Sequence, residues 1–170
     1  DGARAFGGIA VWIAIAGCAG HPLTSKDPDM TVSRSAPPRS GYAPVNGIRM
    51  YFEIHGEAAG IPLVLLHGGG STIDSTYGAI LPSFSRHRRV IALEEQNHGR
   101  TDSRDVPERF STSADDVAAL LGHLHVDKAD FMGFSNGASV ALQVAIRHPA
   151  LIRKLVFASS MTRKSGASPE

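Results

Sequence analysis

A serine between two glycines at a fixed spacing is the first feature of this sequence that could do chemistry. Gly133, Ser135 and Gly137 form the pattern G-x-S-x-G at the end of the apolar run 129–134. The pattern is typical of a nucleophile elbow, a strained strand-to-helix turn that exposes a serine hydroxyl above a parallel sheet. Glycines on either side keep side chains from colliding as the chain doubles back. We interpret Ser135 as a candidate nucleophile; a chance match in a loop is the alternative that the surrounding sequence must exclude.

Backbone N–H groups could stabilise the oxyanion that forms when such a serine attacks an acyl carbonyl. Asn136 would offer one at the start of a helix, where partial positive charge gathers. Gly69 or Gly70 would offer the second, from the glycine-rich turn 67–71. Donors of this kind are worth ~3–4 kcal/mol each in the transition state. For these glycines the alternative is a plain tight turn before a helix.

Apolar runs alternate with helical periodicities and predict the elements that position these residues. Runs typical of buried strands lie at 62–66, 90–93, 129–134 and 155–158. Helical patterns lie at 73–84, 113–124 and 136–147. Regular alternation of strand and helix predicts a parallel α/β sheet with right-handed crossovers.

Local signals refine three of these elements. Asn46-Gly47 predicts the tight turn of a hairpin, because both residues tolerate positive φ values. Pro82 lies inside a helical pattern and predicts a kink or a break into two helices. Ser113, followed closely by Asp115 and Asp116, predicts the start of a helix.

The charge balance and the histidine spacing exclude several classes of function. The chain has 170 residues, of which 17 are Lys or Arg and 16 are Asp or Glu, so no nucleic-acid partner is predicted. The basic cluster 86–89 is interpreted as a solvated corner. His123 and His125 face different directions on a helix and make a poor metal pair. We expect no metal and no cofactor.

The N-terminal residues predict export and lipid attachment. Arg4 precedes an apolar segment of about a dozen residues, as in secretory signals, which is shorter than a membrane-spanning helix. The sequence Ile-Ala-Gly-Cys at 15–18 resembles the lipobox of bacterial lipoproteins. It implies lipidation of Cys18 and a lipid anchor at the periplasmic face of the bacterial envelope, with Ala19 pointing to the outer membrane. A plain export signal with an incidental cysteine is the alternative.

Composition divides the chain into three parts. Residues 1–17 are predicted to be the lipoprotein-type signal, and 18–41 a tether rich in proline and serine without apolar periodicity. Residues 42–170 are predicted to be the folded part, which contains every candidate site residue except Cys18.

From residue 42 to about 161 the sequence resembles the α/β-hydrolase superfamily. The resemblance rests on motifs in the family's order: His67-Gly68-Gly69-Gly70, Asn97-His98-Gly99-Arg100, the elbow, and Arg147-His148-Pro149. It implies hydrolysis of an ester or related acyl bond of a small-molecule substrate, through an acyl-serine intermediate on Ser135. Small esterases, cofactor-free haloperoxidases and carbon–carbon bond hydrolases share the pattern best. Serine in place of aspartate disfavours haloalkane dehalogenase and epoxide hydrolase chemistry.

One position departs from the family's pattern. Many relatives have glycine where Asn97 stands, and asparagine is the next best residue for a left-handed backbone. The loop is therefore expected to keep its shape. We interpret His67 and His98 as structural residues.

The family's triad acid and histidine, which follow the serine in chain order, have no counterpart in this chain. After Ser135 there remain only His148, at the far end of the elbow helix, and Glu170. The resemblance implies an incomplete fold of roughly the first six strands, without the cap and the last two strands. The run 155–158 would then form an open apolar sheet edge and lower stability.

Three interpretations remain open. The chain is the N-terminal part of a longer exported serine hydrolase and inactive alone, or it is a non-catalytic ligand-binding or scaffold lipoprotein. In the third, it completes its site with a separate C-terminal chain. The first predicts negligible turnover of p-nitrophenyl acetate by the isolated chain. The substrate is not predicted, because specificity in this fold comes largely from the cap and from loops that the sequence lacks.

Overall fold

The computed structural model describes residues 11–12 and 37–161 of the chain. Cys18, most of the predicted signal and the predicted tether up to residue 36 lie outside the described residues. Lipidation of Cys18 therefore stays a prediction. In the described part, none of the helices has the length and apolar character needed to cross a membrane.

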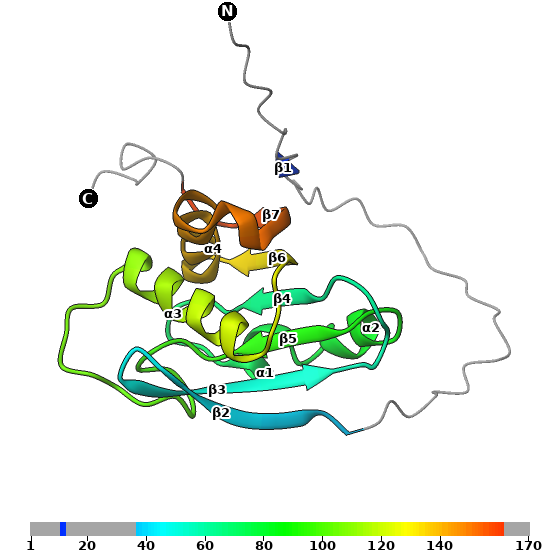
Figure 1. Ribbon diagram of the computed structural model, residues 1–170, viewed down its shortest axis with the longest axis horizontal. Helices are drawn as coiled ribbons and strands as arrows, with labels where there is room; N and C mark the ends of the chain where they lie inside the picture. The colour runs from blue at the N-terminus through cyan, green and yellow to red at the C-terminus, as the bar shows by residue number, and fades with distance from the viewer. Residues whose placement is uncertain (1–10, 13–36, 162–170) are drawn as a thin grey trace, which may run out of the picture.

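One mixed sheet organises the molecule, with the strand order β1-β7-β6-β4-β5-β3-β2 (Figure 1). Its parallel strands are β4 (Leu63–Leu66), β5 (Val90–Leu93), β6 (Ala129–Phe134) and β7 (Ile152–Ala158). A hairpin of β2 (Arg39–Val45) and β3 (Ile48–His55) pairs with β5 in antiparallel orientation. The predicted parallel α/β sheet is confirmed.

The hairpin turn confirms the prediction from Asn-Gly, because Asn46 has a φ of 44° and Gly47 a φ of 88°. Strand β2, however, begins at Arg39, before the predicted boundary of the folded part at residue 42. Residues 39–41 pair with residues 52–54 of β3 and belong to the sheet. The predicted end of the tether at residue 41 is therefore too late.

Helices cover both faces of the sheet. Helices α1 (Ile73–Tyr77) and α2 (Leu81–Ser85) pack on one face, and α3 (Phe110–His123) and α4 (Asn136–Arg147) pack together on the other (Figure 1). A short 3-10 turn, η1 (Pro149–Leu151), leads into β7. Strand β4 serves both faces: Val64 and Leu66 pack in the α3–α4 core, and Leu63 and Leu65 in the α1–α2 core. This alternation explains why the strand is apolar at every position.

Two helix predictions are tested by the structure. The 73–84 pattern is broken into two helices, which is one of the two outcomes predicted from Pro82. Helix α2 starts anew with Pro82 in its first turn, where the missing N–H of proline costs little. The predicted start of α3 at Ser113 is wrong. The N–H of Ser113 donates to Arg109 O at 3.0 Å, so the helix already includes Ser113 and begins at Phe110.

The edge of β7 is partly covered. A two-residue strand, β1 (Val11–Trp12), pairs with it in parallel, opposite Leu155 and Val156. The predicted open edge at 155–158 is thus corrected: within the described residues, β1 lies outside β7 and occupies part of its hydrogen-bonding edge.

Candidate active site

Ser135 occupies the sharp turn between β6 and α4. Its φ of 53° and ψ of −114° are backbone angles that residues other than glycine rarely adopt. Strand β6 lies between β4 and β7, so the turn stands at the carboxyl ends of parallel strands, where open α/β sheets bind ligands. The Ser135 N–H donates to Ala158 O at 2.9 Å, which fixes the turn to the end of β7. This is the geometry of a nucleophile elbow.

Close packing explains both glycines of the motif. A Cβ atom at Gly133 would overlap the backbone of Gly137, and one at Gly137 would overlap the carbonyl oxygen of Leu66. The Gly137 N–H donates to His67 O at 3.0 Å and holds the start of α4 against the end of β4. Only glycine allows this approach, which places the N-terminus of α4 directly beneath the serine.

The structure brings Gly69 and Asn136 together beside Ser135. A Cβ atom built on Gly69 would lie 3.5 Å from Asn136 Cβ, in ordinary contact. Among the described residues, neither the Gly69 N–H nor the Asn136 N–H has a hydrogen-bond acceptor. Gly70 differs, because its N–H donates to His98 Nε2 at 3.0 Å. Of the two candidate glycines, Gly69 is therefore the one with a free N–H in this structure.

His98 is held by hydrogen bonds at both ring nitrogens. Because Nε2 accepts the Gly70 N–H, the proton lies on Nδ1, which donates to Gln96 O at 2.8 Å. The ring thus connects its own loop to the glycine-rich turn. This arrangement leaves no ring nitrogen free for proton transfer.

His67 is engaged in the same way and is fully buried. Its Nε2 accepts the Glu95 N–H at 3.0 Å, and its Nδ1 is 2.7 Å from Gly68 O, to which it donates. Burial lowers the pKa of His67 below its ordinary value. A neutral ring with both nitrogens bonded has a structural role.

His148 lies after the C-terminus of α4, at the opposite end of that helix from Ser135. Its Nε2 is 2.8 Å from Asp115 Oδ1, and Arg147 also pairs with Asp115. In the part of the chain that the structure describes, no histidine is therefore hydrogen-bonded to Ser135. Nor does that part contain three or more His, Cys, Asp or Glu side chains grouped to hold a metal ion.

Glu95 is a further candidate site residue, which the sequence patterns did not indicate. It follows β5, is 3% exposed, and its Oε2 accepts a hydrogen bond from Asn136 Nδ2 at 3.0 Å. Burial raises the pKa of Glu95 to about 8. At neutral pH the elbow is therefore contacted by a protonated carboxyl group. The one signal available in the sequence was the acidic pair Glu94-Glu95 directly after an apolar strand.

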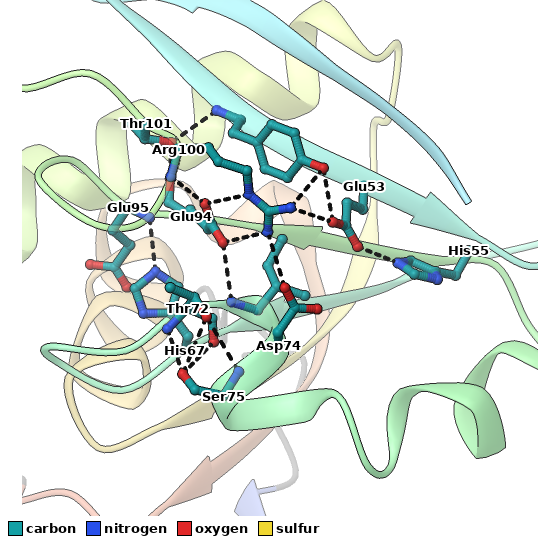
Figure 2. Close-up of polar contacts among 12 residues, drawn as sticks. Glu53, His55, His67, Thr72, Asp74, Ser75, Glu94, Glu95, Arg100 and Thr101 are labelled. Atoms are coloured by element: carbon teal, nitrogen blue, oxygen red, sulfur yellow. Dashed lines mark hydrogen bonds and ion pairs between the residues drawn. The ribbon is translucent and has the colours of Figure 1, made fainter. Parts of the chain in front are cut away.

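Glu94 points the other way, into an ion-pair network that holds the loop after β5 (Figure 2). Arg100 donates to both of its carboxylate oxygens, at 2.6 and 3.1 Å, and also contacts Glu53 and the ring of Tyr51. Burial by itself would raise the pKa of Glu94, but the hydrogen bonds from Arg100 outweigh it and the pKa lies below its ordinary value. Gly99 leaves the space that this carboxylate fills. The network fixes the loop that carries Glu95 and His98.

Comparison with known proteins gives the family. The sequence model described as "alpha/beta hydrolase fold" matches residues 61–169, which is more than half of the chain. The chain belongs to the alpha/beta hydrolase fold family.

Relatives in this family are named as hydrolases. A 2-hydroxymuconate semialdehyde hydrolase from Pseudomonas sp. (strain CF600) is 32% identical over 117 residues, which are 67% of this chain and 41% of that protein. A putative carbamate hydrolase from Agrobacterium fabrum is also 32% identical over 117 residues, covering 67% of this chain and 44% of that protein. The chain spans less than half the length of these relatives.

Solved structures agree on the fold. An enol-lactonase from Burkholderia xenovorans matches with a TM-score of 0.69 and 26% identity, covering 72% of this chain and 48% of that one. A hydrolase from Pseudomonas aeruginosa matches with a TM-score of 0.68 and 29% identity, covering 71% and 46%. The sheet described above is therefore a partial alpha/beta hydrolase fold.

Two hollows adjoin Ser135 in this partial alpha/beta hydrolase fold. One, of about 480 Å³, has a mostly apolar wall that includes Tyr77, Ile80, Met132 and Phe134. The other, of about 560 Å³, has a wall that combines serine hydroxyl groups, the candidate oxyanion residues and two apolar side chains: Ser135, Ser139, Ser159, Ser160, Gly69, Asn136, Phe110 and Met161. The elbow serine thus stands between two hollows, of which the second has the more polar wall.

Proposed function

We propose that this chain is the N-terminal part of a serine hydrolase that cleaves an ester or related acyl bond, with Ser135 as the nucleophile. One observation carries the proposal: Ser135 lies on a strained elbow and shares a hollow with Gly69 and Asn136, whose N–H groups have no acceptor among the described residues. Relatives named as hydrolases support the reaction class. Strain at a hydrogen-bonded turn is typical of a functional position.

The chemistry follows from these groups. Ser135 Oγ attacks the acyl carbonyl carbon, and the carbonyl oxygen becomes an oxyanion that accepts hydrogen bonds from the N–H groups of Gly69 and Asn136. Collapse of this intermediate expels the leaving group, which receives the proton that left Ser135. Water then attacks the acyl-serine, releases the acid and restores the hydroxyl.

A general base must take the proton, because a serine hydroxyl is a weak nucleophile at neutral pH. His67 and His98 are fully hydrogen-bonded and His148 lies at the far end of α4. We propose that the acid and the histidine come from the portion of the family fold that this chain does not span.

The apolar hollow suggests where the acyl group binds. Its wall of Tyr77, Ile80, Met132 and Phe134 offers apolar surface next to Ser135, and pockets with such walls gain affinity by removing apolar ligand surface from water. We propose a substrate with an apolar acyl group in this hollow and a more polar leaving group in the other hollow, whose wall is the more polar of the two.

Fluorophosphonate labelling tests the proposal. The protein to label is the longer protein of which this chain is proposed to be the N-terminal part. We expect covalent labelling that Ser135→Ala abolishes. Ser139→Ala is the matched control: Ser139 lines the same hollow and its hydroxyl bonds with Ser160 at 2.8 Å, so labelling should persist.

Two outcomes would contradict the proposal. Labelling that survives Ser135→Ala places the nucleophile elsewhere. Ser135-dependent turnover of p-nitrophenyl acetate by the 170-residue chain alone would show that the base lies within it, against the proposed origin of the base.

A further inference from the structure

Glu95 lies between the two segments that carry the proposed oxyanion donors. Its side-chain Oε2 accepts from Asn136 Nδ2 at 3.0 Å, and its backbone N–H donates to His67 Nε2 at 3.0 Å. His67 in turn donates from Nδ1 to Gly68 O at 2.7 Å, directly before Gly69. A continuous series of hydrogen bonds through Glu95 therefore joins the start of α4 to the glycine-rich turn.

The strained backbone of Ser135 has to be held by its surroundings. Its φ of 53° and ψ of −114° set the direction of the peptide that carries the Asn136 N–H. Backbone angles this unfavourable persist only where other contacts fix them. The N–H groups of Ser135 and Gly137 form backbone hydrogen bonds on either side of Asn136. Asn136 itself is held through its side chain, and its acceptor is Glu95.

Packing alone does not explain a carboxyl group at position 95. Glu95 is 3% exposed, and its Oε1 has no hydrogen-bond partner among the described residues. A buried oxygen without a partner lowers stability, and an apolar side chain of similar size would avoid this loss. The hydrogen bond to Asn136 is the contact that an apolar side chain could not make.

We propose that Glu95 is a positioning residue for the reaction on Ser135: its carboxyl group holds the Asn136 side chain and so keeps the Asn136 N–H directed at the oxyanion. This inference rests on the proposed function, because it needs Asn136 as an oxyanion donor. Glu95 lines neither of the two hollows that adjoin Ser135, so it acts through Asn136. A misdirected donor weakens stabilisation of the transition state more than binding of the substrate.

The charge state of Glu95 suits this role. Burial raises the pKa of Glu95 to about 8, although the Asn136 amide and the Ser113 hydroxyl favour the ionised form. At neutral pH the carboxyl group therefore accepts the Asn136 hydrogen bond without placing a negative charge beside the oxyanion. The other charged or titratable groups around it are Glu108, Asp116 with its partner Arg104, Arg109, His67 and His98.

Steady-state hydrolysis of p-nitrophenyl acetate by the longer protein tests the inference. Glu95→Leu keeps the approximate size of the side chain but removes the acceptor. We expect it to lower kcat and kcat/KM by the same factor, about tenfold or more, because the lost interaction acts in the transition state. Glu95→Gln should restore most of the activity at pH 7, because its amide oxygen can accept from Asn136. Glu57→Leu, the same change at an exposed residue, should have the kcat and KM of the wild type.

The pH profile gives a second readout and decides the case in which Glu95→Leu does not fold. As pH rises through about 8, Glu95 ionises and its negative charge opposes the oxyanion, so kcat of the wild type should fall. Glu95→Gln cannot ionise and should lack this fall. In that case, coinciding profiles of the wild type and Glu95→Gln would overturn the inference.

Fluorophosphonate labelling of the same preparations separates this inference from the proposed function. If Ser135 is labelled and folded Glu95→Leu has the kcat of the wild type, the positioning role alone fails. The same holds if Glu95→Gln loses as much activity at pH 7 as Glu95→Leu, because the acceptor is then not what matters. If Ser135 is not labelled in the wild type, the proposed function fails and this inference fails with it.

Discussion

The pKa values of two adjacent carboxyl groups, Glu94 and Glu95, are shifted in opposite directions, because their side chains point to opposite sides of one strand end. Arg100 hydrogen-bonds to Glu94 and keeps its pKa low despite burial. No cation contacts Glu95 in the described part of the chain, and burial raises its pKa to about 8. A buried carboxyl group without a countercharge is destabilising when ionised, so its presence next to the elbow favours a functional role.

The pH dependence of the free energy of unfolding should reveal the raised pKa of Glu95. Glu95 has a folded-state pKa of about 8 and an unfolded pKa near ~4.3. Between these values the unfolded chain is ionised and the folded protein is protonated, so stability falls as pH rises from about 4.3 to 8, by at most ~1.4 kcal/mol per pH unit. Glu95→Gln lacks this contribution. Urea denaturation at pH 5, 6, 7 and 8 should show the wild type losing stability relative to the variant.

The exposed residue Glu57 provides the control. Glu57→Gln should leave the pH dependence of the wild type unchanged. If wild type and Glu95→Gln give parallel curves from pH 5 to 8, Glu95 is ionised in the folded protein and its burial does not perturb it.

At the residue scale, the sequence correctly predicted the features that depend on the spacing of neighbouring residues. The positions of Ser135, Gly133 and Gly137 follow from a turn in which each residue constrains its neighbours. Glu95 was missed because its role depends on Asn136, 41 residues away, which approaches only when β5 and β6 take their places in the sheet. No local pattern records that contact.

At the scale of elements, continuous apolar runs located the parallel strands correctly because both faces of the sheet are covered. The start of α3 was predicted too late, because an acidic first turn after Ser113 resembles a helix start. The helix in fact begins at Phe110, and Ser113 lies within it, near Glu95. Capping signals are therefore weaker than the tertiary contacts that decide where this helix begins.

The junction of β6 and α4 gives a prediction at this scale. Gly137→Ala should lower the free energy of unfolding by about 2–3 kcal/mol, because its Cβ would overlap the Leu66 carbonyl oxygen and force α4 away from β4. Urea denaturation would measure the loss.

The exposed Gly122 in α3 is the matched control. A Cβ atom there meets nothing within 4 Å, so Gly122→Ala should stabilise the protein by about 0.5–1 kcal/mol through helix propensity. Equal effects of the two substitutions would mean that α4 does not need its close approach to the sheet.

At the scale of the molecule, the sheet is asymmetric. One side ends in the β2–β3 hairpin, whose antiparallel pairing occupies seven residues of each strand. The other side ends at β7, whose only described outer partner is β1, over two residues. The chain also spans less than half the length of its relatives. The sequence predicted an apolar edge at 155–158 but could not show that residues 11–12 cover part of it, because so short a pairing has no sequence pattern.

Self-association should therefore depend on β7. A protein of residues 37–170 lacks β1 and exposes the whole edge, and unpaired apolar strands promote association between chains. Val156 lies on this edge opposite Trp12 and is 38% exposed. We expect the shortened protein to associate with rising concentration in sedimentation velocity experiments, and Val156→Lys to restore monomers, because a lysine on an edge strand opposes pairing.

A substitution at Ile146 in α4 tests whether strand pairing at the β7 edge or exposed apolar surface in general causes the association. It is an exposed apolar residue, at 63%, but lies on a helix and offers no strand to pair. Ile146→Lys should therefore leave the shortened protein associated. If both lysines abolish association equally, apolar surface drives it. If only Val156→Lys does, backbone pairing along β7 is the cause, and this edge is where the chain needs a further strand.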